Sequence, residues 1–186
     1  MRICVYCSSS DGLDSKYYEE GRAFGRELAK RGHSLVYGGY CKGIMAAVAE
    51  GVHENGGEIT AVVPKVFDRE GFTYDGCTRV IKTPDMNSRK KTMEAEAEAI
   101  AVLPGGIGTM DEFFEALVLK TIGEFDKPVG VLNTAGCYDI LVQLLDRSTE
   151  DGFLSTSNRE CARFFTDADV MLDHLEKESG LYDYPF

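Results

Sequence analysis

The chain has 186 residues, of which 44% are hydrophobic and 27% are charged, and these proportions are typical of a soluble globular protein. A formal net charge of -11 argues against sequence-independent nucleic-acid binding, which requires basic side chains that neutralise phosphates. No apolar run approaches the roughly 20 residues of a membrane-spanning helix, and the N-terminal residues lack a signal-peptide pattern. We therefore expect a single cytoplasmic domain over residues 1–186 that binds neither nucleic acid nor membrane.

Segments typical of strands and helices alternate along the chain. In order, we expect a strand over 2–6, a helix over 15–31, a strand over 34–37, a helix over 43–54, a strand over 58–63, a loop over 65–76, a strand over 79–82, a helix over 87–98, a strand over 99–103, a helix ending at 122, a strand over 128–132, a helix beginning over 138–145 and a helix over 167–178. For the aromatic tail Leu181–Phe186, packing onto the core is preferred over an interface or a lid.

Nearly all-apolar strands that alternate with helices indicate a parallel sheet with helices on both faces. We therefore predict a Rossmann-like, doubly wound α/β fold. Ligands of such sheets bind beyond the carboxyl ends of the strands, so the loops that lead from strand to helix are the candidate site.

The six cysteines are scattered along the chain. Cys4 and Cys7 form a C-x-x-C pattern, but no second pair and no histidine spacing completes a zinc site. Their odd spacing directs them to opposite faces of a strand. We expect reduced, mostly buried thiols and no metal site.

The stretch Leu103–Glu112 (LPGGIGTMDE) is the most informative part of the sequence. Its three glycines lie between a strand and a helix, where the backbone can approach a ligand and the helix amides would face an anion. Glu112 is an unusual residue for a pure phosphate site. The spacing of Thr109 and Glu112 also fits a helix capping box, which is the purely structural alternative.

Two further strand-to-helix loops carry weaker signals. The first, Cys7–Gly12, is rich in serine but lacks G-x-G-x-x-G, which makes a nicotinamide dehydrogenase unlikely, and a simple helix-capping turn is an equally good interpretation. The second contains Gly38, Gly39 and Gly43. Together with the glycines of the 103–112 stretch, it could place amides around one phosphate-bearing ligand.

The cluster Arg89-Lys90-Lys91 lies near the start of its expected helix. Positive charge there is unfavourable against the helix dipole by about 0.3–1 kcal/mol, and the planar guanidinium of Arg89 suits a phosphate or a carboxylate. We therefore favour a ligand role for Arg89 over a surface charge. A carboxylate near a bound phosphate is costly unless it pairs with a cation or acts on another part of the ligand, and an Arg89–Glu112 arrangement would meet either need.

These residues carry a resemblance to a known family. Pro104–Glu112 matches PGGxGTxxE, Arg89-Lys90 lies upstream at the expected distance, and Val36–Gly39, Gly43–Met45 and Asp126–Asp139 extend the match. Over roughly residues 2–145 the chain resembles the Lonely Guy family of cytokinin-activating phosphoribohydrolases, many of which carry the older label lysine decarboxylase. The chain departs from the family where Tyr40 replaces the third glycine of a triplet, and where Val118, Leu119 and Thr121 follow the main motif.

The resemblance implies a dimeric, Rossmann-like enzyme without a cofactor that cleaves the N-glycosidic bond of an N6-modified adenosine 5′-monophosphate, or of AMP. It also implies Arg89 and Glu112 as the catalytic pair, with Glu112 at the sugar, where an oxocarbenium-like transition state develops. The candidate substrate-binding residues are Ser8, Gly38, Gly39, Gly43, Glu70, Lys90, Gly105, Gly106, Ile107, Gly108, Thr109 and Asp111.

Two other functions remain open at this point. The glycine loops also resemble those of molybdenum-cofactor carrier proteins, so a non-catalytic carrier or sensor of a nucleotide-like cofactor is the alternative. A lysine decarboxylase is the least favoured, because that chemistry usually needs pyridoxal phosphate on a lysine and no lysine has a recognisable cofactor context.

Overall fold

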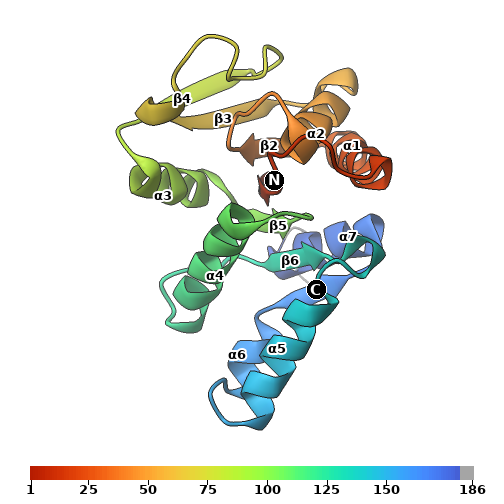
Figure 1. Ribbon diagram of the computed structural model, residues 1–186, viewed down its shortest axis with the longest axis vertical. Helices are drawn as coiled ribbons and strands as arrows, with labels where there is room; N and C mark the ends of the chain where they lie inside the picture. Colours follow the sequence, from red (N-terminus) through yellow and green to blue (C-terminus); the bar gives the residue numbers. More distant parts are fainter. Residues whose placement is uncertain (181–186) are drawn as a thin grey trace, which may run out of the picture.

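Seven parallel strands form one sheet in the computed structural model, which describes residues 1–180 (Figure 1). The aromatic tail Leu181–Phe186 lies outside the described residues. The strands are β1 Arg2–Tyr6, β2 Ser34–Tyr37, β3 Ile59–Pro64, β4 Arg79–Thr83, β5 Ala99–Val102, β6 Val129–Leu132 and β7 Arg163–Phe165, in the spatial order β4-β3-β2-β1-β5-β6-β7. This order confirms the predicted doubly wound α/β fold.

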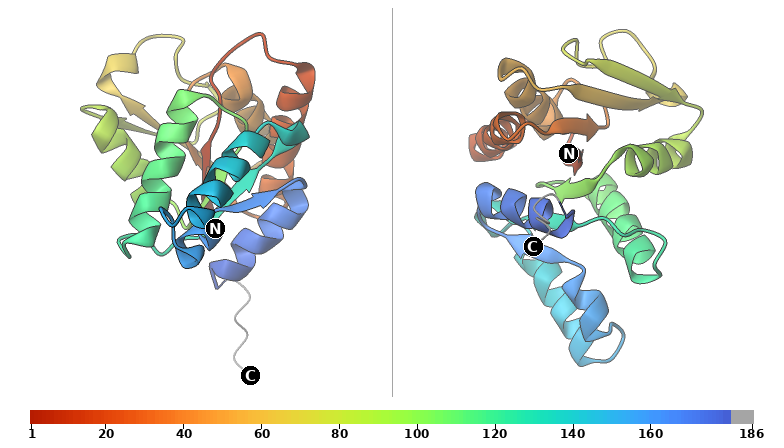
Figure 2. Two further views of the ribbon diagram at one scale, coloured as in Figure 1. Left: turned by 60° about the horizontal axis from the view of Figure 1, so that its bottom comes forward. Right: turned by 180° about the vertical axis from the view of Figure 1, so that it is seen from behind.

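Helices cover both faces of the sheet (Figure 2). They are α1 Ser15–Lys30, α2 Gly43–Glu54, α3 Met86–Glu96, α4 Ile107–Thr121, α5 Asp139–Glu150, α6 Thr156–Glu160 and α7 Ala168–Glu178, with the short 3-10 turns η1 Lys65–Phe67 and η2 Thr134–Gly136. The core on one face joins side chains of α1, α2 and α7, and the core on the other joins side chains of α3, α4 and α5. No helix among residues 1–180 is long and apolar enough to cross a membrane.

The direction of winding changes between β1 and β5, and this change creates the site. The chain moves from β1 outward to β4, returns through α3, and then forms β5 on the other side of β1. The paired ends of β1 and β5, Tyr6 opposite Val102, are followed by two loops that lead to helices in different layers, α1 and α4. A crevice opens beyond the carboxyl ends of the strands at such a point.

The structure differs from the sequence predictions at the C-terminal edge of the sheet and at the cysteines. Strand β7 and helix α6 were not predicted, because each is short and α6 has no buried residue. Cys4 and Cys7 belong to opposite cores, as expected. The prediction of mostly buried thiols is wrong, since only these two of the six free cysteines are buried and Cys137 is exposed.

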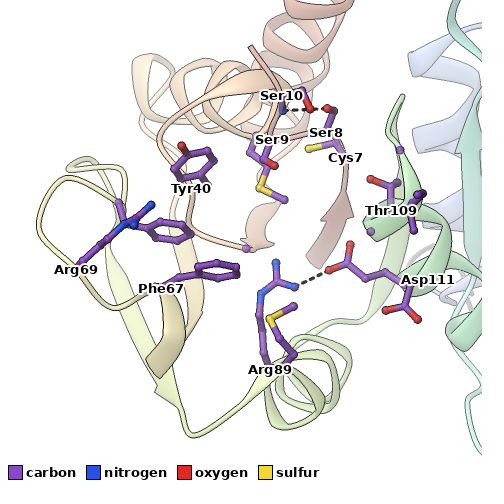
Figure 3. A pocket seen from close by; sticks show the side chains of 18 residues that line it. Cys7, Ser8, Ser9, Ser10, Tyr40, Phe67, Arg69, Arg89, Thr109 and Asp111 are labelled. Carbon is purple, nitrogen blue, oxygen red and sulfur yellow. Dashed lines mark hydrogen bonds and ion pairs between the residues drawn. The ribbon is translucent and has the colours of Figure 1, made fainter.

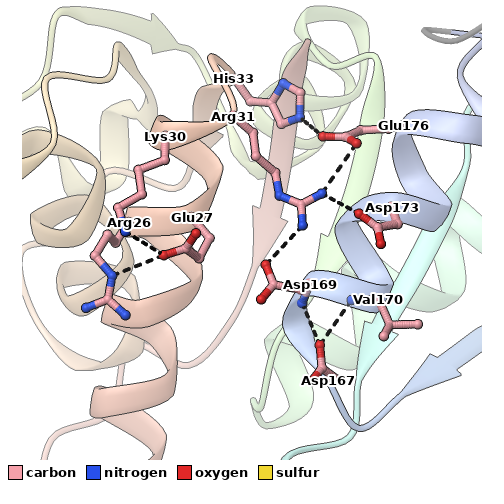
Figure 4. A network of polar contacts seen from close by, with 10 residues as sticks. All are labelled: Arg26, Glu27, Lys30, Arg31, His33, Asp167, Asp169, Val170, Asp173 and Glu176. Atoms are coloured by element: carbon pink, nitrogen blue, oxygen red, sulfur yellow. Dashed lines mark hydrogen bonds and ion pairs between the residues drawn. The ribbon is translucent and has the colours of Figure 1, made fainter.

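A polar network attaches α7 to the end of α1 (Figure 4). Arg31 pairs with Asp169 at 3.0 Å and with Asp173 at 2.6 Å. Nε2 of the buried His33 lies 2.6 Å from Glu176, while its Nδ1 lies 3.2 Å from the α-amino group of Met1. An ammonium group can only donate, so Nδ1 accepts and Nε2 carries the proton donated to Glu176. The network is therefore satisfied by neutral His33, and burial lowers the pKa of this histidine.

Candidate active site

A cavity of about 490 Å³ lies beyond the carboxyl ends of the central strands (Figure 3). Its walls come from the loops after β1, β2, β3 and β5 and from the first turns of α3 and α4. The structure brings nine of the predicted site residues into these walls: Ser8, Gly38, Arg89, Gly106, Ile107, Gly108, Thr109, Asp111 and Glu112.

A buried ion pair between α3 and α4 forms part of the cavity wall. Nη1 of Arg89 donates to Oε1 of Glu112 at 2.6 Å, and Nε of Arg89 donates to the carbonyl of Val62 at 3.3 Å. Arg89 is 5% exposed and Glu112 is 6% exposed. Burial raises the pKa of Glu112 above its ordinary value, and the Arg89 guanidinium opposes that shift. The predicted proximity of the two residues is confirmed.

Helix α4 begins at Ile107, with Gly106 as its N-cap and without a side-chain capping bond. Thr109 and Glu112 both lie inside the helix, so the capping-box interpretation is wrong. The first amides of a helix have no acceptor within the helix, and those of α4 belong to residues that line the cavity. The N-terminal end of α4 is therefore suited to an anion.

Gly105 precedes this turn, and the absence of a side chain there leaves space for the side chain of Thr109. A Cβ atom at position 105 would lie 2.0 Å from Oγ1 of Thr109. Gly105 thus shapes the turn without lining the cavity.

The second glycine loop acts through close packing. Gly38 lines the cavity, where a Cβ atom would lie 2.0 Å from Nη2 of Arg89. Gly39, at φ +83°, packs on β3, and Gly43, at φ +66°, packs on the backbone of Ser8 and Ser9. The Met45 amide of α2 donates to the carbonyl of Ser8 at 3.1 Å and is not available to a ligand. Gly39 and Gly43 therefore fix the shapes of the loops, while the first residues of α4 line the cavity.

Lys90 and Glu70 also lie outside the cavity lining. Nζ of Lys90 pairs with Asp111 at 3.0 Å and with Glu115, so this lysine connects α3 to α4 beside the buried pair. Glu70 is exposed in the turn after η1, and its neighbour Arg69 lines the cavity instead.

The sequence did not identify the aromatic side of the cavity. Tyr40, Phe67 and Phe72 line it together with the methionines Met45 and Met86. Figure 3 shows Tyr40, Phe67 and Arg69 on one side, Thr109 and Asp111 on the other, and Arg89 between them. One residue of the sequence pointed to this side of the cavity, because Tyr40 stands where the resembling family has glycine. The other apolar residues lie in a loop, and such residues do not by themselves predict a binding site.

Three further lining residues follow β1. Cys7, Ser9 and Ser10 line the cavity with Ser8, whose amide donates to the carbonyl of Pro104 at 3.0 Å. This bond holds the loops after β1 and β5 together. Within residues 1–180, no cluster of three or more His, Cys, Asp or Glu is arranged to bind a metal ion.

The chain is similar to one described protein family and to curated plant proteins. A family model described as "Possible lysine decarboxylase" matches residues 45–175. The cytokinin riboside 5′-monophosphate phosphoribohydrolase LOG4 of Arabidopsis thaliana is 36% identical over 98% of this chain and 85% of that protein. The probable cytokinin riboside 5′-monophosphate phosphoribohydrolase LOGL6 of Oryza sativa subsp. japonica is 35% identical over 98% of this chain and 73% of that protein.

Solved structures share the fold. The molybdenum cofactor binding protein from Rippkaea orientalis has a TM-score of 0.73 at 16% identity, over 95% of both chains. The molybdenum cofactor carrier protein from Chlamydomonas reinhardtii has a TM-score of 0.72 at 19% identity, over 95% of this chain and 96% of that one. At these identities the likeness shows the fold alone.

Proposed function

The chain belongs to the family described as possible lysine decarboxylases, and we propose from this premise that it is a nucleoside 5′-monophosphate phosphoribohydrolase. It hydrolyses the N-glycosidic bond of an adenosine 5′-monophosphate-type nucleotide. The substrate class comprises AMP and the cytokinin riboside 5′-monophosphates. The curated relatives are named after their activity on the latter. The products are the free base and ribose 5-phosphate.

The observation that carries this proposal is the position of the Arg89–Glu112 pair between two unlike ends of one cavity. The α4 amides at one end suit a phosphate. The aromatic side chains at the other end suit a flat, apolar base. A nucleotide that spans the two ends presents its sugar to the buried pair.

The chemistry follows from the charges of the pair. Cleavage develops positive charge on the sugar, and the Glu112 carboxylate stabilises that charge and accepts a proton from the attacking water. Water adds to the anomeric carbon while the base leaves with the electrons of the broken bond and takes up a proton. The guanidinium of Arg89 donates to Glu112, so it orients this carboxylate and anchors the ligand. Phosphate binding at α4 positions the sugar for the reaction.

The two other functions have less support. Carrier proteins share the fold at 16–19% identity, whereas the curated relatives at 34–37% identity are phosphoribohydrolases. Lysine decarboxylation would require a lysine free to hold pyridoxal phosphate, and Lys90 is already paired with Asp111 and Glu115.

We also propose that the enzyme is a homodimer in the cytoplasm. Apolar side chains are exposed on two helices of one layer, among them Val118 of α4, Ile122 directly after it, and Ile140 and Leu144 of α5. Such residues favour burial against a second copy. The free cysteines of the described residues fit a reducing compartment.

The direct test incubates the purified protein with AMP and with N6-isopentenyl-AMP and separates the products by chromatography. Free base and ribose 5-phosphate should appear in equal amounts from at least one nucleotide. Absence of both free bases, or equal rates for the wild type and Glu112→Ala, would overturn the assignment.

A further inference from the structure

Three aromatic rings form a continuous stack on one side of the cavity, and we call Tyr40, Phe72 and Phe67 the aromatic wall. The centroids of Tyr40 and Phe72 lie 4.7 Å apart, and those of Phe72 and Phe67 lie 5.2 Å apart with an interplanar angle of 7°. Phe72 is 8% exposed and is covered by the other two rings. Tyr40 and Phe67 are therefore the rings that can receive a ligand.

Backbone bonds hold the wall in place before any ligand arrives. Tyr40 and Thr73 form an isolated antiparallel bridge. The Cys41 amide donates to the carbonyl of Phe72 at 3.0 Å, and the Tyr74 amide donates to the carbonyl of Gly39 at 3.0 Å. These bonds join the loop after β2 to the segment after η1, so the rings require little further ordering when they bind a ligand.

Charge distinguishes this wall from the opposite end of the cavity. The faces of aromatic rings carry partial negative charge, which disfavours contact with a phosphate. Among the described lining residues on this side, Arg69 supplies the cation, and Figure 3 shows its side chain beside the wall. The α4 amides lie on the other side, with Thr109. The free α4 amides therefore favour the phosphate of a nucleotide at α4, and the flat ring faces favour its base at the wall.

We propose that the aromatic wall is the base subsite of the enzyme and that Tyr40 and Phe67 determine its affinity for the base. This inference rests on the proposed function, because it assigns the part of the nucleotide that is not phosphate or sugar. Stacking of a base on an aromatic side chain changes affinity by about 5- to 140-fold when the ring is removed. The wall should act on binding of the whole nucleotide and leave the cleavage step unaltered.

The test compares a ligand that has a base with one that lacks it. Glu112→Gln serves as the background because the proposed mechanism makes it consume AMP far more slowly than the wild type does. Calorimetry then gives the dissociation constants of AMP and of ribose 5-phosphate, with and without Tyr40→Ala or Phe67→Ala. A single base can stack on the outer face of only one of these rings, so one of the two changes should weaken AMP binding by about 5- to 140-fold, and both should leave ribose 5-phosphate binding unchanged. Tyr40→Phe, which keeps the ring, should retain most of the AMP affinity.

Phe153→Ala is the matched control, because Phe153 is 87% exposed and does not line the cavity. It should alter neither constant. The base subsite would be overturned if Tyr40→Ala and Phe67→Ala weakened the binding of AMP and of ribose 5-phosphate equally. It would also be overturned if neither change altered AMP binding, or if the Glu112→Gln background did not bind AMP. A wild-type protein that binds AMP through the wall and cleaves neither AMP nor N6-isopentenyl-AMP would overturn the proposed function and leave the base subsite standing.

Discussion

Gly38→Ala tests whether the position of Arg89 controls the reaction. A methyl group at position 38 would lie 2.0 Å from Nη2 of Arg89, 3.2 Å from its Cζ and 3.3 Å from Cε of Met45. Gly38 does not have a positive φ, so alanine fits the backbone and its effect comes from the methyl group alone.

The size of the effect follows from this geometry. Ordinary contact begins at 3.4 Å, so the guanidinium must withdraw by about 1.4 Å. Its hydrogen bond to Glu112, now 2.6 Å, then lengthens or bends out of range. A misplacement of about 1 Å can reduce a rate by about 10²-fold, which corresponds to about 2.7 kcal/mol of transition-state stabilisation. Crowding should also lower the free energy of unfolding by about 1–3 kcal/mol.

The assay measures kcat/KM for AMP hydrolysis per folded molecule, together with urea unfolding. Gly130→Ala is the matched control, because its methyl group would lie 2.8 Å from Cγ of Met171, in the contact between β6 and α7. That variant should lose stability and keep its kcat/KM. The reasoning is refuted if Gly38→Ala keeps kcat/KM within about threefold of the wild type, which is less than about 1 kcal/mol.

Three further predictions concern titratable groups. Glu112→Gln should lower kcat by about 10²–10⁴-fold. Because burial raises the pKa of Glu112 above 4.5, the wild-type kcat/KM should fall on the acid side at a pH above 4.5. A fall only at or below pH 4.5 would contradict the requirement for an ionised Glu112. The pKa of His33 in the folded protein is lowered from 6.5, so as the pH falls this histidine takes up a proton in the unfolded chain before it does so in the folded one. The free energy of unfolding should therefore decrease as the pH drops below 6.5. Urea unfolding across that pH range should show a smaller loss for His33→Gln, and equal losses would exclude this histidine as the cause. Burial raises the pKa of Glu94 from 4.5 to about 6, which penalises the folded state above pH 6. Glu94→Gln should therefore increase the free energy of unfolding at neutral pH by up to about 2 kcal/mol, and a gain that persists below pH 4.5 would refute this cause.

The sequence determined the central part of the fold better than its edge. The bounds of β1, β2 and α2 were predicted to the residue, because buried parallel strands are continuous apolar runs that end at glycine-rich loops. Strand β7 lacks such a pattern, since it has three residues and none of them is fully buried. Its pairing with β6, Gly130 opposite Arg163, is a tertiary contact that no local pattern encodes.

The site divides in the same way. The Arg89–Glu112 pair could be predicted because one motif contains an acid that a phosphate site does not need and one cluster contains a cation at an unfavourable helix position. The capping box failed because Gly106 starts α4 three residues before Thr109, and the local spacing cannot specify where a helix begins. The aromatic wall could not be predicted, because it depends on a bridge between Tyr40 and Thr73, far apart in the chain.

The pairing of the cations near the cavity has a kinetic consequence. Arg89 is neutralised by Glu112 and Lys90 by two carboxylates, in a chain whose net charge is -11. An incoming nucleotide dianion therefore meets repulsion at long range and attraction only close to the cavity, from Arg69 and the α4 amides. Salt at about 0.15 M shortens the reach of that repulsion to about 8 Å. Diffusional capture of substrate should thus speed up as ionic strength rises, the reverse of an enzyme that draws anions with a positive field.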